Sequence, residues 1–339
     1  MAYMMSVAVN IVTWNGKDFL PHLLKSLMAQ TYQPKRILVI DNGSVDGTLE
    51  LLREWPTVHV LRNNRNLGFA HGHNQGIALS GADAVLIVNQ DLILDPRCIE
   101  RLVDEMEHDR AVGSVCPLVY RFRFTEGDLR EPAISDTIDT AGLAVRRSRQ
   151  SVNVDEGRRP SAGAYQAPSE VFGVHGVLAL FRKTALQDVA YGDEYFDDDF
   201  FAYKEDVDLA WRLRWAGWRA RLVPSSIAYH YRTLTHHGDR VSSVLKTRME
   251  RSSTLRTISY RNHLLTMLKN ESSGTFLPDL PFILFYEIRR LGYLLLREWS
   301  TLAALPQIVR LMPRMRRKRA AIRRTRRIDT HTMRTFIKS

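Results

Sequence analysis

The sequence is poor in cysteine and has no long apolar run. Its 339 residues include only Cys98 and Cys116, too few for a disulfide framework or a CxxC-type metal cluster, so we expect a reducing compartment. The most lipid-like stretch, residues 276–296, contains Asp279 and Glu287 with two arginines and two prolines, which argues against a membrane-spanning helix. The first residues lack the cationic segment of a signal peptide, and we expect none.

Positive charge is concentrated at one end of the chain. Residues 289–339 hold 15 Lys or Arg against two acidic residues, whereas residues 1–288 hold 33 basic and 35 acidic residues. The basic character therefore belongs to the tail alone. With 45% hydrophobic and 25% charged residues, the chain suits one large domain with an appendage, or two small domains.

The first 120 residues alternate short apolar runs with helical patterns, which predicts βαβ units and a mainly parallel sheet with flanking helices. We expect strands at residues 6–13, 37–40, 58–61 and 84–88, helices at 17–29 and 70–79, and another helix from Asp95-Pro96. Residues 121–170 lose this periodicity and are expected to form loops. A helix at 205–216 and short strands at 219–223 and 227–231 should follow.

Polar residues follow three of the predicted strands. Ligands of open α/β sheets bind beyond the carboxyl ends of the strands, so the candidates are Thr13-Trp14-Asn15, Asp41-Asn42-Gly43-Ser44 and Asn89-Gln90-Asp91. Asp41 is placed to accept the imide N–H of uracil or thymine. The alternative is that Asp41-Asn42-Gly43 only forms a turn.

The triplet Asn89-Gln90-Asp91 resembles a DxD motif with Asn in the first position. Its last carboxylate would hold Mg²⁺ or Mn²⁺ bridging a donor diphosphate, because these cations prefer oxygen ligands. An aspartate that caps the next turn would give the same triplet.

The most informative segment is FDDDFFAYKEDVDLAWRLR, residues 196–214. Its helix should place Glu205 and Asp208 on one face and Asp206 on another, with Asp208 paired to Arg212. Interaction with the helix dipole explains one or two such carboxylates, but not the whole cluster.

Aromatic residues stand among these carboxylates. Phe201 and Tyr203 would offer a sugar ring a stacking surface and partly desolvate a base, which raises its pKa toward the working pH. This arrangement suits deprotonation of an acceptor hydroxyl. His230 follows a short apolar run and is either a core residue or, given its place after the acidic helix, part of the same site.

Six segments together resemble the family 2 glycosyltransferases of GT-A fold, especially the bacterial rhamnosyltransferase-like branch. The resemblance covers residues 5–232 and rests on IVTWNGKDFLPHLLKSLMAQTY, VIDNGSVDGT, NRNLGFAHGHNQGI, IVNQD, FGVHGVLALFRKTAL and FFAYKEDVDLAWRLRWAGWRARLVPSSIAYH. It implies a Rossmann-like GT-A domain at residues 1–235 and a helical, basic, membrane-associating region at residues 236–339.

The resemblance also implies roles for individual residues. The donor would contact Thr13, Asn15, Asp41, Asn66, Gly68, His73, Asn74, Asn89 and Asp91. Mg²⁺ or Mn²⁺ would bind Asp91, with His230 as a further metal or diphosphate contact. The acceptor would contact His175, Phe201 and Tyr203, and Asp206, in the pair with Glu205, would be the base of an inverting displacement. Asn89 departs from the family's DxD pattern, which leaves the metal one carboxylate fewer.

The implied reaction transfers L-rhamnose from dTDP-L-rhamnose to a hydroxyl of a polyprenyl-linked or cell-surface glycan precursor. UDP-galactofuranose and UDP-N-acetylhexosamines are alternative donors. Two other classes stay open. The first is a nucleotidyltransferase, which would need a Gly-rich basic loop near the N-terminus; residues 13–17 match such a loop poorly. The second is a membrane scaffold without catalytic activity.

The tail carries ten Lys or Arg within residues 310–327. Such a run suits an anionic lipid surface, at about 1 kcal/mol per basic residue, and residues 282–296 add an apolar face. We therefore expect a peripheral protein on the cytoplasmic face of the inner membrane. Nucleic acid is the alternative partner of this basic run, but the run lacks interleaved aromatic residues, which disfavours that alternative. A solvated helix without a partner is the third possibility. The oligomeric state stays open.

Overall fold

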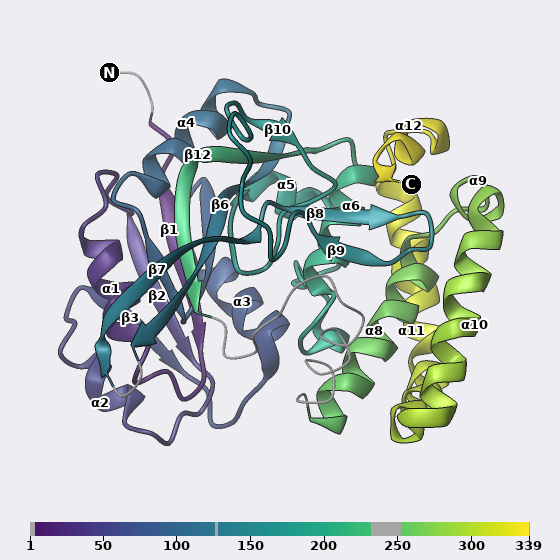
Figure 1. The fold of residues 1–339 in the computed structure, drawn as a ribbon, viewed down its shortest axis with the longest axis horizontal. Helices are drawn as coiled ribbons and strands as arrows, with labels where there is room; N and C mark the ends of the chain where they lie inside the picture. The colour runs from purple at the N-terminus through teal and green to yellow at the C-terminus, as the bar shows by residue number, and fades with distance from the viewer. Residues whose placement is uncertain (1–3, 126–127, 232–251, 339) are drawn as a thin grey trace.

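One edge of the central sheet consists of four parallel strands. The computed structural model describes residues 4–125, 128–231 and 252–338. The strands are β1 (Val7–Thr13), β2 (Arg36–Asp41), β3 (Val58–Arg62) and β4 (Ala84–Asn89), connected through α1 (Leu20–Met28), α2 (Thr48–Leu52) and α3 (Gly68–Leu79). They lie in the order β4-β1-β2-β3 (Figure 1). Each predicted strand and helix of this part is confirmed.

The other part of the sheet has mixed directions. Its elements are β5 (Leu92–Leu94), α4 (Cys98–His108), β6 (Val112–Thr125), β10 (Ser169–Glu170), β11 (Leu178–Arg182) and β12 (Arg219–Tyr231). The strand order is β10-β12-β6-β11-β4, so β11 joins the two parts by antiparallel pairing with β4 and β6. Residues 219–231 form one strand with an irregularity between Val223 and Ile227, where the sequence predicted two.

Residues 121–170, predicted as loops, contain strands instead. β7 (Asp128–Thr140) pairs with β6, and β8 (Leu143–Arg146) pairs with β9 (Ser151–Asn153). The prediction failed because charged residues interrupt the alternation by which a half-buried strand is recognised. The helix predicted at Asp95-Pro96 begins later, at Cys98, and Asp95 accepts the N–H of Arg97 through its side chain at 3.1 Å.

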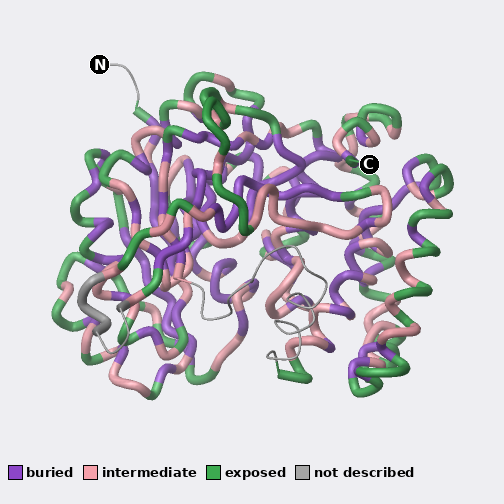
Figure 2. Tube along the Cα trace, in the orientation of Figure 1, coloured by how far each residue is buried: buried purple, intermediate pink, exposed green. Residues whose placement is uncertain are grey.

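Apolar side chains fill both sides of the sheet. Leu23 of α1 and Leu102 of α4 belong to one core cluster. Ile77 of α3 and Leu213 belong to the other, which includes residues of α5 (Lys183–Asp188) and α6 (Glu205–Trp215). A short 3-10 helix, η1 (Asp198–Phe200), precedes α6. Figure 2 shows the buried residues concentrated in this layered body.

The chain after residue 251 is helical, as predicted. It comprises α8 (Ser253–Asn270), α9 (Ser273–Phe276), η2 (Leu277–Asp279), α10 (Leu280–Arg297), η3 (Trp299–Ala303), α11 (Ala304–Thr325), α12 (Thr330–Thr335) and β13 (Ile337–Lys338). α8 packs against both α11 and α6, and β13 pairs with β8, so the region returns to the body (Figure 1). The predicted boundary at residues 235 and 236 lies outside the described residues. Of the helices described, none has the length and apolarity to cross a bilayer.

Candidate active site

Three predicted site residues end neighbouring strands. In the parallel register Thr13 lies opposite Asp41, and Val12 lies opposite Asn89. The carboxyl ends of β1, β2 and β4 therefore meet at one edge of the sheet. The sequence-based grouping of these strand ends is confirmed.

The end of β1 is in close contact with the turn after β4. The Thr13 hydroxyl donates to Oε1 of Gln90 at 2.5 Å, and the same oxygen accepts the N–H of Trp14 at 3.1 Å. Gly16 is required here, because a Cβ at that position would lie 2.3 Å from the Thr13 hydroxyl oxygen. Asn15 donates its N–H to Ser44 Oγ at 2.8 Å, which ties β1 to the turn after β2.

Asp41 is fully buried at the end of β2. Its two carboxylate oxygens accept the N–H of Ser44 at 3.3 and 3.2 Å. The turn that was the alternative interpretation of Asp41-Asn42-Gly43 is thus present, with Gly43 at φ +76°. Such a turn leaves lone pairs of the carboxylate available to a second donor.

Asn66 and Gly68 shape the loop before α3. The Asn66 carboxamide oxygen accepts the N–H of Gly68 at 2.8 Å. Gly68 has φ +88°, and a Cβ there would lie 2.5 Å from the ring of Phe201. The loop therefore approaches the segment before α6 so closely that only glycine fits.

His73 and Asn74 lie in the interior. The His73 ring is fully buried, 4.2 Å from the ring of Phe69 between centroids, and burial lowers the pKa of His73 to about 3. The Asn74 side chain donates to the carbonyl of Phe196 and to Asp198, both at 2.8 Å. The His73 ring also lies 6.0 Å from the ring of Phe196 between centroids, so both residues contact the segment before α6, and their contact with the donor stays a prediction.

Asp91 and His230 are adjacent, as the metal prediction requires. Nε2 of His230 lies 3.3 Å from Asp91, and its Nδ1 lies 2.8 Å from Asp139. Burial disfavours the imidazolium, but the two carboxylates outweigh this effect and raise the pKa of His230 to about 9. Asp139 is itself fully buried beside Arg121, at 3.3 Å.

At neutral pH this pKa keeps His230 protonated, so a cation would bind between His230 and Asp91 by displacing the proton of Nε2, and it would be shared with a phosphorylated ligand. A carboxylate behind the imidazole is the usual partner of a metal-binding histidine, and Mg²⁺ commonly takes one or two protein ligands with substrate phosphates and waters. Within the described part of the chain, no three His, Cys, Asp or Glu side chains group closely enough to hold an ion alone. Asp91 and His230 would therefore need the diphosphate to complete the site.

A cleft of about 450 Å³ opens at this edge of the sheet. Its lining includes Asn89 of β4, Asn153 of β9, Ser259 of α8, and Glu205 and Asp206 at the start of α6, together with Phe69, Glu156, His175, Gly176, Tyr203 and Lys204. Asn89 is two residues before Asp91, and Glu156 lies 3.5 Å from Arg121, which contacts Asp139. Asn89 and Glu156 thus connect the lining of the cleft to Asp91 and, through Arg121 and Asp139, to His230.

The two candidate bases differ in their surroundings. The Asp206 carboxylate accepts the N–H of Gly176 at 3.1 Å and that of Val207 at 2.8 Å. Burial raises the pKa of Asp206, although these hydrogen bonds and the charge of Lys204 act in the opposite direction. Glu205 is 6% exposed, and its Oε2 has no hydrogen-bond partner among the described residues. Burial and the charge of Asp206 raise the pKa of Glu205 to about 8. At neutral pH the pKa of about 8 keeps the proton on Glu205, and the N–H groups of Gly176 and Val207 stabilise negative charge on Asp206.

Two of the three predicted acceptor contacts line the cleft. His175 is buried in its wall, and Tyr203 borders it. Phe201 instead packs on Gly68. Phe201 and Tyr203 have φ of 63° and 69°, in the left-handed region that side chains rarely adopt.

Sequence reasoning missed several residues around the cleft. Asn153 of β9, Glu156 of the turn after it, and Ser259 of α8 line the cleft, and Asp139 of β7 lies behind His230. Lys204 stood in the predicted acidic segment, and its Nζ donates to Ser151 Oγ at 2.5 Å across the cleft. No periodic signal marks these positions, because each depends on pairing between distant parts of the chain.

Comparisons with known proteins agree with this geometry. Residues 8–190 match Glycosyl transferase family 2, and residues 159–266 match Glycosyl transferase family group 2. The N-acetylglucosaminyl-diphospho-decaprenol L-rhamnosyltransferase of Mycobacterium tuberculosis (strain CDC 1551 / Oshkosh) is 30% identical over 250 residues, which cover 65% of this chain and 74% of that enzyme.

Two further proteins are similar over part of their length. The poly-beta-1,6-N-acetyl-D-glucosamine synthase of Staphylococcus aureus (strain MSSA476) is 26% identical over 231 residues, which cover 65% of this chain and 48% of that protein. The crystal structure of GalNAc-T7 with UDP, GalNAc and Mn²⁺ superposes with a TM-score of 0.61 at 16% identity, covering 79% of this chain and 48% of that one. This chain spans about half the length of these two proteins, and the second likeness concerns the fold.

Proposed function

The chain belongs to glycosyl transferase family 2 and has its GT-A fold, and from this premise we propose an inverting transfer in which Asp206 is the base. The observation that carries the proposal is the shared cleft. Asp206 and Asn89 line one cavity, and Asn89 stands two residues before Asp91, which lies 3.3 Å from His230. A donor diphosphate held at Asp91 would therefore present its sugar toward a carboxylate that can receive a proton.

The reaction that fits this cleft is a single displacement. Asp206 takes the proton of the acceptor hydroxyl, the hydroxyl oxygen bonds to the anomeric carbon, and the bond from that carbon to the phosphate oxygen breaks. The nucleoside diphosphate leaves with the electron pair. The N–H groups of Gly176 and Val207 orient Asp206, and the buried, protonated Glu205 avoids a second negative charge beside it.

A divalent cation, Mg²⁺ or Mn²⁺, would supply positive charge to the departing diphosphate. Asp91 and His230 would hold it. The Nδ1–H of His230 would donate to Asp139 and so fix the orientation of the imidazole. Thr13 and Asp41, which lie opposite each other at the neighbouring strand ends, would contact the nucleoside.

We propose dTDP-L-rhamnose as donor and a lipid-linked glycan precursor as acceptor. The similarity to an enzyme named for L-rhamnosyl transfer onto a diphospho-decaprenol carrier supports this choice. The similarity to a poly-N-acetylglucosamine synthase supports the alternative, a UDP-linked donor such as a UDP-N-acetylhexosamine or UDP-galactofuranose.

We further propose that the C-terminal helices dock on the cytoplasmic face of an anionic membrane. α10 and η3 expose apolar side chains, among them Ile288 at 67%, Leu296 at 83% and Trp299 at 77%. Exposed arginines lie on the same helices, Arg289 and Arg297 among them. An apolar helix face bordered by cations is suited to the lipid headgroup region.

Flotation with liposomes tests the docking face. Ile288→Glu with Leu296→Glu should lower binding to vesicles that contain anionic lipid, whereas Ile134→Glu, at a residue of β7 that is 57% exposed, should leave binding unchanged. Equal flotation of both variants would reject this face as the membrane contact.

The Asp206→Asn variant tests the reaction. The amide cannot accept the proton, so turnover should fall at least about 100-fold while donor affinity, measured by calorimetry, stays unchanged. Retained turnover in Asp206→Asn would move the base to Glu205 or exclude this mechanism.

A further inference from the structure

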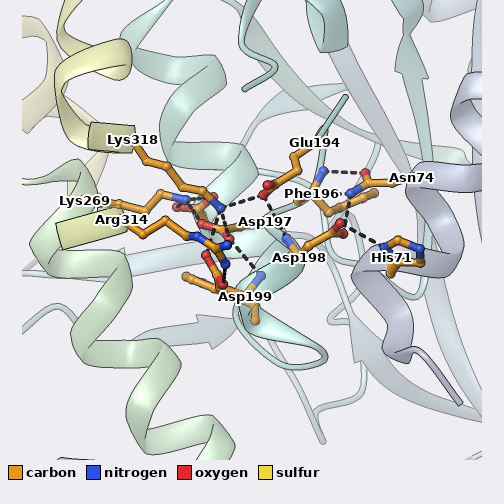
Figure 3. Close-up of polar contacts among 12 residues, drawn as sticks. His71, Asn74, Glu194, Phe196, Asp197, Asp198, Asp199, Lys269, Arg314 and Lys318 are labelled. Carbon is orange, nitrogen blue, oxygen red and sulfur yellow. Dashed lines mark hydrogen bonds and ion pairs between the residues drawn. The ribbon is translucent and has the colours of Figure 1, made fainter. Parts of the chain in front are cut away.

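The segment before α6 is held by cations of the C-terminal helices. We call residues 194–204 the acidic strap. Lys318 of α11 places its Nζ 2.5 Å from Asp197, 2.5 Å from Glu194 and 3.1 Å from Asp199. Lys269 of α8 also pairs with Asp197, and Figure 3 shows the two lysines converging on the strap.

These contacts are buried. The side chains of Asp197, Lys269 and Lys318 are 1%, 2% and 3% exposed. Lys269 also lies 2.9 Å from Asp208 of α6. The same lysine therefore fixes both the strap and the helix that begins with Glu205. Lys318, one of the ten basic residues of 310–327, therefore points inward to the strap.

The strap backbone is held by α8 as well. Nδ2 of Asn262 donates to the carbonyl oxygens of Phe200, Ala202 and Tyr203 at 2.8, 2.9 and 2.8 Å. Nη2 of Arg261 donates to the carbonyl of Asp199 at 2.7 Å. These groups fix the carbonyls of four strap residues.

The strap needs such support because its backbone is strained. Phe201, Tyr203 and Lys204 have φ of 63°, 69° and 71°, and each such position costs about 1–3 kcal/mol. The strain lies directly before Glu205, the first residue of α6. The path of these residues therefore determines where Asp206 points.

The opposite side of the strap contacts the donor side of the sheet edge. Asp198 lies 2.9 Å from His71 and 2.8 Å from Asn74, both of α3 (Figure 3). The carbonyl of Phe201 accepts the N–H of Ala70 at 3.2 Å. The strap is thus fixed between α3 on one side and α8 and α11 on the other.

We propose that Asn262, Lys269 and Lys318 are positioning residues of the transfer reaction, which hold the acidic strap in the conformation that directs Asp206 into the cleft. The inference rests on the proposed role of Asp206. It makes the C-terminal helices part of the catalytic unit in addition to any membrane contact.

Asn262→Ala in the full chain is the principal test, because it removes the three carbonyl contacts without leaving a buried charge unpaired. We expect kcat to fall about 10- to 100-fold, as for a misplaced catalytic group. The dissociation constant of the donor should stay within about twofold of the parent's, because the variant does not remove a contact with the donor. Arg327→Ala is the matched control, because Arg327 joins the C-terminal region to Asp188 of α5 without touching the strap.

A second variant series addresses the lysines. Lys318→Met removes the positive charge that neutralises Glu194, Asp197 and Asp199, so both stability and kcat should fall. Lys318→Arg keeps this charge and should retain most of the parent's kcat. Combining Asn262→Ala with Asp206→Asn should lower residual turnover no further than Asp206→Asn alone, because the positioning acts through that carboxylate.

The outcomes separate the two proposals. Full turnover in Asp206→Asn overturns the assignment of the base. Impaired Asp206→Asn with parental kcat in folded Asn262→Ala overturns the positioning role alone. A further drop in the double variant, in proportion to that of Asn262→Ala, also overturns it, because the residue would then act independently of Asp206.

Discussion

Replacement of Glu205 by Gln tests the electrostatics of the candidate bases through protein stability. Glu205 is almost fully buried, and one of its oxygens has no hydrogen-bond partner in the described residues. Burial and the neighbouring Asp206 raise the pKa of Glu205 from 4.5 to about 8. The folded protein therefore retains a proton that the unfolded chain releases.

The sign of the effect follows from this difference. Below about pH 4.5 the carboxyl is protonated in both states, and between about pH 4.5 and 8 the unfolded state is favoured increasingly because it alone ionises freely. Stability is lost at up to about 1.4 kcal/mol per pH unit across this interval, or at most about 5 kcal/mol in total. The Gln side chain cannot ionise, so this part of the pH dependence should disappear.

Urea denaturation at several pH values between 5 and 8.5 measures the free energy of unfolding directly. The parent should become less stable relative to Glu205→Gln as the pH rises. Glu54→Gln, at an exposed position of the loop before β3, controls for the general effect of removing a carboxylate. Parallel stability profiles for the parent and Glu205→Gln would refute the buried, protonated state of this residue.

Three other substitutions give expectations of known direction. Asp139→Asn removes the anion behind His230 and should weaken the affinity for Mn²⁺ about 10- to 100-fold. Calorimetry with a nucleoside diphosphate present measures this affinity, and an unchanged value would exclude His230 and Asp139 from the metal site. Asp91→Ala should abolish the response of turnover to added Mn²⁺, and a persistent response would place the cation elsewhere. Gly68→Ala should lower the free energy of unfolding by about 1–3 kcal/mol more than Gly157→Ala, because both glycines have positive φ but only the first has a neighbouring ring in the way; equal losses in urea denaturation would reject steric contact as the cause.

The parallel part of the fold was predictable because each strand carries its own apolar run. The strand ends at Thr13, Asp41 and Asn89 could be grouped for the same reason, since parallel strands bring their carboxyl ends to one edge. The pairing of Asp208 with Arg212, at 3.0 Å, was predictable because it depends only on helical spacing.

The remaining site residues depend on contacts between distant segments. Asp139 lies on a strand whose polar residues conceal the alternation, so neither the strand nor its contact with His230 was visible in the sequence. The basic tail showed its charge but not its partners. Lys318 and Asp197 are 121 positions apart in the chain, and only the packing of α11 on the body joins them.

The most direct measurement of the central claim is the identity of the product released from a panel of nucleotide sugars. The protein would be supplied with Mn²⁺ and a lipid-linked glycan acceptor, and with dTDP-L-rhamnose, UDP-galactofuranose or a UDP-N-acetylhexosamine in turn. We expect a nucleoside diphosphate to appear in equal amount with the glycosylated acceptor for one donor, with dTDP-L-rhamnose preferred. Pyrophosphate in place of the diphosphate, or no product from any donor that the protein is shown to bind, would contradict sugar transfer at this cleft.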